Sequence, residues 1–324
     1  MRAYSWIIGL ITWLTFPAAL PGQQEEGFKI SWIDQFPAGE EAVRKSLGER
    51  ISAIVLGPQP LALIKPFGVV ANHPEECWIL DQGAGTIVHV NRGKGNIIRS
   101  MHRANQDFPS LVGLSLLPGG ELFFSDSKLN QVYRVDEEKT RLFSDSVILR
   151  QPTGIAFHPG KEELWVVETA AHRIAVFNRS GVLLKRIGSR GTGPGQFNYP
   201  TFIWIDREGR IYVVDSMNFR IQMLDPEGVW MTSFGKQGDG SGDLARPKGV
   251  ATDSHGNIYI TDALFHVVQI FNPEGEFLDS FGGQGQGQGE FWMPAGIYID
   301  EADHIFVADS YNSRVQVFKL EKRE

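Results

Sequence analysis

Short apolar runs, separated by polar turns, recur along most of the chain in units of about 40–50 residues. Residues 200–206 (PTFIWID), 247–253 (PKGVATD) and 294–300 (PAGIYID) are copies of one segment, each 47 residues after the one before. A second and a third apolar run follow each copy, at residues 210–215, 257–262 and 304–309, and then at 220–225, 267–272 and 314–319. Short runs rich in Val, Ile, Phe and Tyr and bounded by Gly, Pro, Asn and Asp predict β-strands.

Weaker copies of the same unit precede these three. Their first runs are residues 66–71 (PFGVVA), 111–116 (LVGLSL) and 152–157 (PTGIAF), which brings the number of units to six. A fourth run completes several units, as at residues 182–188, 229–235 and 276–282, and follows tight turns such as residues 225–228 (DPEG). Four antiparallel strands in units of about 40–50 residues, with no helical pattern between them, predict an all-β fold, a six-bladed β-propeller.

The two ends of the repeat array predict how the ring closes. The sixth unit ends at residues 319–324 (KLEKRE) without a fourth strand, while a strand-like segment at about residues 28–33 (FKISWI) precedes the first unit. We expect this N-terminal strand to pair as the outer strand of the sixth blade, because it would cover an otherwise open edge. The propeller itself is then predicted over residues 66–320.

Residues 1–65 are predicted to contain a leader and an extension. Arg2, the apolar residues 6–16 and a short segment up to Gly22 have the layout of a secretory signal peptide. We therefore expect residues 1–22 to be removed and the mature chain to be secreted or periplasmic, without a membrane span; an uncleaved anchor is the alternative. Residues 23–65 form the extension, in which residues 40–54 favour a short amphipathic helix. This helix covers part of the central channel or serves as a surface spacer.

Charge and cysteine content narrow the function classes. The 324 residues include 31 Lys and Arg against 38 Asp and Glu, which gives a formal charge of −7. An acidic surface repels phosphate backbones, so nucleic acid is disfavoured as a partner, although a local basic patch is compatible with this charge. Cys77 is the only cysteine, which excludes an intramolecular disulfide and a cysteine-based zinc site.

The repeat sequence resembles the NHL repeat. The resemblance rests on the PxGVA-like first run, the IYVxD-like second run, the Asn-x-Arg-x-Gln pattern at residues 218–222 and 312–316, and the glycine-rich linkers 188–197 and 282–291. It covers roughly residues 60–319 and implies the six-bladed fold, but little about function, because one fold serves many functions. Family members include a peptidyl-hydroxyglycine lyase, and related propellers include calcium-dependent lactonases. The resemblance therefore also raises a metal-dependent lyase or lactonase that acts at the central channel.

An acidic residue ends the second strand of every unit, and the six are expected to form a ring on one face. One interpretation is a cation site or an anionic binding surface. The favoured interpretation is structural, because the acid recurs in every blade: each carboxylate accepts hydrogen bonds from its own loop and pairs with an Arg five residues later, where the unit has one. The six acids are Asp81, Asp126, Glu168, Asp215, Asp262 and Asp309.

The sequence predicts no catalytic residue and no metal site. None of the 8 histidines lies in the core of a first strand, where a channel ligand would be expected, and zinc needs three or four converging ligands. His172 and His266 fall in loops between second and third strands and are expected to be exposed. No cofactor is indicated, and calcium or zinc would enter only with the lyase or lactonase alternative.

The favoured function is recognition of a protein or peptide partner by a non-enzymatic scaffold. The loops between second and third strands and the inter-blade loops share one face, and loops on a rigid scaffold are the usual sites of recognition. Arginine and aromatic side chains commonly anchor interfaces. The residues expected to rim this face are Arg190, Tyr199, Phe219, Arg246, Lys248, Phe265, Trp292 and Tyr311.

Overall fold

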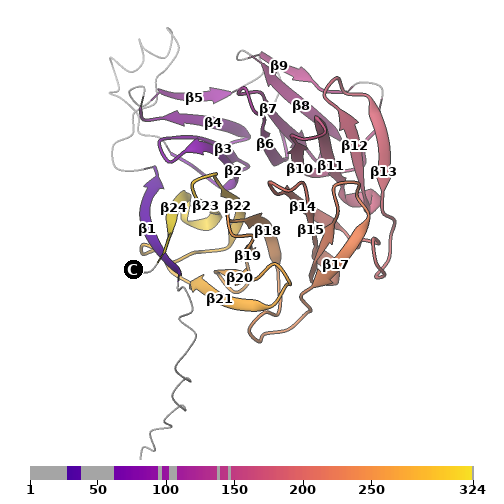
Figure 1. The fold of residues 1–324 in the computed structure, drawn as a ribbon. Coiled ribbons are helices and arrows are strands. Elements are labelled where there is room, and N and C mark those ends of the chain that lie inside the picture. The colour runs from indigo at the N-terminus through magenta and orange to yellow at the C-terminus, as the bar shows by residue number, and fades with distance from the viewer. Residues whose placement is uncertain are drawn as a thin grey trace, which may run out of the picture.

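The computed structural model describes residues 28–37, 62–93, 97–101, 108–136, 139–144 and 147–322. Within these ranges the chain forms six four-stranded antiparallel sheets around a common centre, which confirms the predicted propeller (Figure 1). The predicted leader, residues 1–22, and the predicted helix at residues 40–54 lie outside the described residues. Among the helices of the described ranges, none is long and apolar enough to cross a bilayer.

The strands follow the repeat order seen in the sequence. Blade 1 contains β2 Pro66–His73, β3 Glu76–Asp81, β4 Thr86–Asn91 and β5 Ile97–Met101. Blade 2 contains β6 Leu111–Leu116, β7 Leu122–Asp126, β8 Gln131–Asp136 and β9 Lys139–Leu142. Blade 3 contains β10 Pro152–His158, β11 Glu163–Glu168, β12 Arg173–Asn178 and β13 Leu183–Ile187.

The second half repeats this order with a closer match between units. Blade 4 contains β14 Pro200–Ile205, β15 Ile211–Asp215, β16 Arg220–Leu224 and β17 Trp230–Phe234. Blade 5 contains β18 Pro247–Thr252, β19 Ile258–Asp262, β20 Val267–Phe271 and β21 Phe277–Gly282. Blade 6 contains β22 Pro294–Ile299, β23 His304–Asp309, β24 Arg314–Lys322 and, from the other end of the chain, β1 Phe28–Phe36. Short 3-10 turns follow the second strand in blades 3, 4 and 6: η1 Thr169–Ala171, η2 Ser216–Asn218 and η3 Ser310–Asn312.

The first strand of each blade lies innermost, so that β2, β6, β10, β14, β18 and β22 surround the centre of the ring (Figure 1). Neighbouring inner strands approach closely where the repeat has glycine. A Cβ atom on Gly113 of β6 would lie only 2.1 Å from the carbonyl oxygen of Thr153 on β10. Glycine is required there because any side chain would push the two backbones apart.

The hydrophobic core consists of six clusters, each between two adjacent blades. Trp165 of blade 3 and Ile203 of blade 4 share one cluster, and Val69 of blade 1 and Phe306 of blade 6 share another. Each sheet is therefore covered on both faces, and the second strands are buried along nearly their whole length. Burial on both faces explains why these strands appear in the sequence as continuous apolar runs instead of alternating ones.

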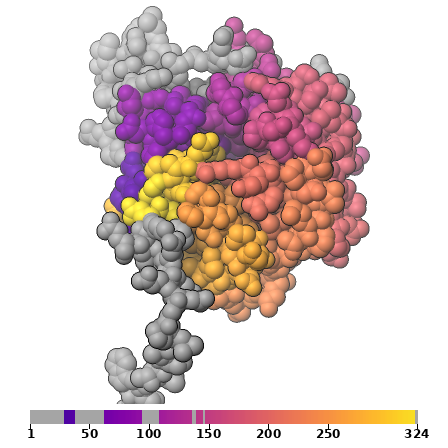
Figure 2. All heavy atoms as spheres, viewed as in Figure 1, coloured from indigo at the N-terminus to yellow at the C-terminus, as the bar shows by residue number. Residues whose placement is uncertain are grey.

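Strand β1 closes the ring as predicted and is longer than the predicted segment 28–33. It pairs antiparallel with β24 from Phe28 to Phe36, with a register shift at Ile33. The indigo β1 and the yellow β24 lie side by side, although they come from opposite ends of the chain (Figures 1 and 2). Phe36 is fully buried in the cluster between blades 6 and 1. Arg92 of blade 1 pairs with Asp34 and donates to the carbonyl oxygen of Gln35 at 3.0 Å, which joins β1 to the first blade as well.

Candidate functional site

The propeller has two different faces. The loop face carries the turns that follow the second strands and the inter-blade loops, so the acidic residues at the ends of β3, β7, β11, β15, β19 and β23 lie beneath it. The turn face, on the opposite side, carries the turns between first and second strands, such as residues 206–210, and between third and fourth strands, such as residues 225–229. The residues expected to bind a partner belong to the loop face.

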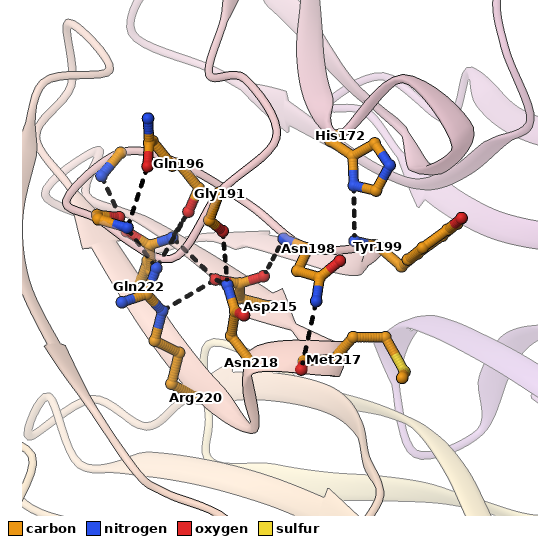
Figure 3. A network of polar contacts seen from close by, with 12 residues as sticks. His172, Gly191, Gln196, Asn198, Tyr199, Asp215, Met217, Asn218, Arg220 and Gln222 are labelled. Atoms are coloured by element: carbon orange, nitrogen blue, oxygen red, sulfur yellow. Dashed lines mark hydrogen bonds and ion pairs between the residues drawn. The ribbon is translucent and has the colours of Figure 1, made fainter.

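All six acidic side chains are buried with no exposed surface. In blade 4 the Asp215 carboxylate accepts hydrogen bonds from the Asn198 backbone N–H at 2.6 Å, Arg220 Nε at 2.9 Å, and the amides of Asn218 and Gln222 at 2.8 and 3.0 Å (Figure 3). Arg220 also donates to two carbonyl oxygens of the inter-blade loop. The carboxylate therefore fixes both the turn after β15 and the loop before β14.

Asp309 in blade 6 repeats this arrangement with Trp292 N–H, Asn312, Arg314 and Gln316 as donors. Glu168 in blade 3 is longer by one methylene and accepts from two arginines, Arg173 and Arg186, at 2.7 and 3.0 Å. These are the blades in which a 3-10 turn follows the second strand.

Where the arginine is missing, backbone N–H groups take its place. Asp262 accepts hydrogen bonds from the N–H groups of Ala245 and Arg246 in the preceding loop and of Leu264 and Phe265 in its own turn. Asp81 and Asp126 are held in the same way by N–H groups of their own turns and of the loops before their blades. All six carboxylates thus have several donors within the fold, which is the arrangement that the structural interpretation requires.

Two histidines on the loop face connect neighbouring blades. The Tyr199 N–H donates to His172 Nδ1 at 3.1 Å (Figure 3). In the same way, the Met293 N–H donates to His266 Nδ1 at 3.0 Å. Asn130 accepts an equivalent hydrogen bond from the next blade, from the Gln151 N–H at 2.7 Å. The expectation that these histidines are exposed is wrong for His172, which is buried, and His266 is half-buried. Both rings bind the next blade through a nitrogen lone pair.

The eight predicted rim residues lie on the loop face but differ in exposure. Arg190, Tyr199, Arg246, Trp292 and Tyr311 are exposed. The other three are half-buried, and one of them packs against the core between blades 4 and 5. These three are Phe219, Lys248 and Phe265.

Sequence reasoning missed several apolar residues of this face, two of which lie in the turns after second strands. Met217 and Leu264 have 55% and 56% of their surface exposed, as much as Tyr311 with 53%. All three stand two residues after the acid that ends the second strand. That position points to solvent because the acid before it is held inward, so the repeat alignment could have identified them.

The turn face has a cavity at the centre of the ring. Its volume is about 390 Å3, and apolar residues of the inner strands line its floor, among them Leu114, Ile155 and Ile203. Asp206, Asp253 and Asp300, at the ends of three inner strands, stand at its mouth together with charged turn residues. This cavity is the place where a channel enzyme would hold its substrate.

The carboxylates at this mouth are bound within their own turns. Asp206 accepts from Arg210 Nε at 2.7 Å and from the Tyr212 hydroxyl at 3.0 Å, and Asp253 accepts from the Tyr259 hydroxyl at 3.0 Å. Burial, and then the charge of the neighbouring carboxylate, raises the pKa of both tyrosines, so they stay protonated donors. Asp300 is bound in the same way by its own turn.

The carboxylates at the mouth of this cavity are not arranged as a metal site. Within the described part of the chain, no group of three or more His, Cys, Asp or Glu side chains converges as a metal site would require. The carboxylates of Asp206, Asp253 and Asp300 instead accept hydrogen bonds from turn N–H groups and side chains.

Sequence families match three parts of the chain. Residues 143–229 match a family described as a six-bladed β-propeller (DUF5128), residues 229–261 match a β-propeller repeat, and residues 291–318 match the NHL repeat. No curated protein sequence is similar enough to count as a relative. The resemblance to the NHL repeat is therefore confirmed at residues 291–318, and residues 143–229 resemble a six-bladed β-propeller family.

Solved structures share the fold at low sequence identity. Virginiamycin B lyase from Staphylococcus aureus superposes with a TM-score of 0.60 at 16% identity, covering 91% of this chain and 100% of the lyase. An auxiliary nutrient binding protein from Bacteroides ovatus gives 0.62 at 14% identity, covering 81% and 70%. A chain of a nidogen/laminin complex gives 0.57 at 19% identity, covering 76% and 86%. Identities this low show the fold alone.

Proposed function

For a six-bladed propeller with an NHL repeat, we propose an exported, non-enzymatic scaffold that recognises a protein or peptide partner through its loop face. The observation that carries this proposal is the group of exposed apolar side chains on that face. Tyr199, Met217, Leu264, Trp292 and Tyr311 each expose 40–56% of their surface. Exposed aromatic and aliphatic groups that gather on one face are typical of interaction sites.

The turns that present these side chains are rigid. Trp292 donates its backbone N–H to the buried Asp309 at 2.7 Å, and Leu264 does the same to Asp262 at 3.0 Å. Presenting a side chain from a fixed backbone lowers the entropy lost on binding, and thereby favours affinity. The ring of carboxylates would thus support recognition indirectly, by holding the loop face in one conformation.

The metal-dependent lyase or lactonase alternative has less support. It would use the turn-face cavity, where the carboxylates are bound in their own turns. The fold itself is compatible with both classes, since a lyase and a chain of a nidogen/laminin complex share it.

Site-specific photo-crosslinking tests the proposal. A photo-reactive amino acid placed at Leu264 on the loop face should crosslink a partner in the extracytoplasmic fraction of the producing cell. The same group at Leu278, which is similarly exposed but lies on the outer strand β21, is the matched control and should not. Changing Trp292 to Ala should lower the Leu264 crosslink about tenfold, whereas Trp230→Ala on the outer strand β17 should not change it. Equal crosslinking from Leu264 and Leu278 would contradict the proposal.

A further inference from the structure

One inner strand carries a charge at the loop-face end of the central channel. The second residue of the inner strand is apolar or uncharged in five blades and a lysine in blade 5. The six residues are Phe67, Val112, Thr153, Thr201, Lys248 and Ala295. Lys248 is half-buried, and in the neighbouring blade 6 the equivalent residue is the small and uncharged Ala295.

Two more cations lie close to Lys248. Arg246 stands two residues earlier in the loop before β18, and Lys65 precedes β2 on the other side of blade 6. Burial, then the positive charges of Arg246 and Lys65, lower the pKa of the Lys248 ammonium. We refer to Lys65, Arg246 and Lys248 as the basic cluster. It is formed by blades 5 and 1 around the loop-face end of blade 6.

No carboxylate of the described residues forms an ion pair with the basic cluster. Asp243, the acid closest along the chain, pairs with Lys236 at 3.7 Å. Asp262, whose charge acts on Lys248, accepts hydrogen bonds from backbone N–H groups at 2.8–3.3 Å, two of them in the loop that contains Arg246. The Asp262 charge opposes the effect of Arg246 and Lys65 on Lys248 but is the smallest of these influences. Like charges held together disfavour one another, and the repulsion is larger where solvent is partly excluded. A bound anion would relieve it.

Aromatic residues of blade 6 adjoin the basic cluster. Lys65 Nζ lies 5.6 Å from the centre of the Tyr311 ring, within the range of a cation–π contact. The Tyr311 and Trp292 rings are 5.9 Å apart, and both are exposed. The basic cluster is therefore continuous with the apolar side chains that we propose as the partner-binding surface.

We propose that the basic cluster binds the carboxylates of an acidic peptide segment, whose apolar side chains contact Trp292 and Tyr311. The proposal rests on the proposed function and specifies the chemistry of the partner. Three cations beside two aromatic rings match a short segment with a few Asp or Glu residues and an apolar neighbour. A long polyanion such as RNA matches less well, because the chain as a whole has a charge of −7 and repels it beyond the cluster.

The test uses a fluorescent hexaglutamate peptide and the full propeller, with fluorescence anisotropy as the readout. Hexaglutamate should bind at low salt, weaken as salt is raised, and bind the Lys248→Gln protein about tenfold more weakly, the loss of one close ion pair. Arg246→Gln should have a similar effect. Lys236→Gln is the matched control, because Lys236 lies in an inter-blade loop with 81% of its side chain exposed, and it should change binding less than about twofold. An unchanged melting temperature shows that each variant is folded.

Three outcomes would overturn the inference. Hexaglutamine could bind as well as hexaglutamate, or Lys236→Gln could weaken binding as much as Lys248→Gln, which would indicate unspecific attraction. A hexauridylate oligonucleotide or inorganic phosphate could bind more tightly than hexaglutamate through the same lysine, which would identify a phosphate site instead. These results are separate from the crosslinking test: loop-face crosslinks without hexaglutamate binding would refute only the acidic partner, and hexaglutamate binding without crosslinks would refute only the proposed function.

Discussion

Single residues decide how each buried carboxylate is held. In blades 3, 4 and 6 an arginine stands five residues after the acid, and a 3-10 turn lies between them. Blades 1, 2 and 5 have no arginine at this position; the residues there are Thr86, Gln131 and Val267. In these blades the backbone N–H groups of the turn donate to the carboxylate instead. Both solutions stabilise a charge that burial would otherwise make unfavourable. The missing arginines are therefore compensated by the backbone.

Removing one of these carboxylates should destabilise the whole protein. Asp215→Ala leaves Arg220, whose side chain is only 15% exposed, without its ion-pair partner. It also removes an acceptor of the Asn198 N–H and of the Asn218 and Gln222 amides. We expect the free energy of unfolding to fall by about 3–5 kcal/mol, measured by urea denaturation. Asp225→Ala is the control, because that carboxylate accepts only two N–H groups in an exposed turn and should cost about 1 kcal/mol. A similar loss for both variants would contradict the structural role.

A buried histidine should make stability depend on pH. His158 is 5% exposed, and among the described residues neither ring nitrogen has a hydrogen-bond partner. Burial, and then the charge of Lys161, lowers its pKa. The unfolded chain thus binds the proton more readily, with an imidazole pKa of about 6.5. The associated stability is fully present above about pH 6.5 and is lost as the pH falls toward the lower pKa of the folded state.

Melting temperatures at pH 5 and pH 7.5 test this expectation. The wild-type protein should melt lower at pH 5, and His158→Leu should reduce that difference because its side chain cannot be protonated. His73→Gln is the control, since the His73 side chain is half exposed, and it should keep the wild-type difference. An acid-induced drop of the same size in His158→Leu would show that other groups are responsible.

At the scale of elements, β1 is an outer strand that also contributes a side chain to the hydrophobic core. Phe36 at its end has no exposed surface, whereas Ile33 at the register shift is 40% exposed. Phe36→Ala should lower the free energy of unfolding by about 3–5 kcal/mol, and Ile33→Ala in the same strand by less than about 1 kcal/mol. Urea denaturation of both variants provides the comparison. If Phe36→Ala were as stable as Ile33→Ala, β1 would not be part of the core that closes the ring.

Elements were more predictable from the sequence than the site was. The period of 47 residues and the acid at the end of each second strand place the strands, because every unit must bury the same faces. The length of β1 was underestimated, since residues 34–36 have no equivalent in the repeats and are fixed by pairing with β24 and by Arg92. The burial of His172 was also missed, because its partner is the backbone of the next blade.

At the scale of the whole molecule, ring closure creates neighbours that the sequence separates widely. Lys65 and Lys248 act on each other only because blades 5, 6 and 1 are consecutive around the ring. A chain with a formal charge of −7 thereby acquires a local cluster of positive charge on one face. The order of charges along the sequence does not predict this cluster, because Lys65 is far from Arg246 and Lys248 in the chain. The order of the blades around the closed ring does predict it.

The pairing of β1 with β24 also sets the order in which the chain can be completed. Phe28–Phe36 emerges first during synthesis, and its partner Arg314–Lys322 emerges last. At translation rates of about 5–20 residues per second, the first strand waits roughly 15–60 seconds for the last one. Throughout that interval the edge that pairs with β24 has no native partner, and unpaired strand edges are prone to aggregation. A molecule that pairs its first described strand with its last one therefore depends on being kept from other chains until β24 has been made.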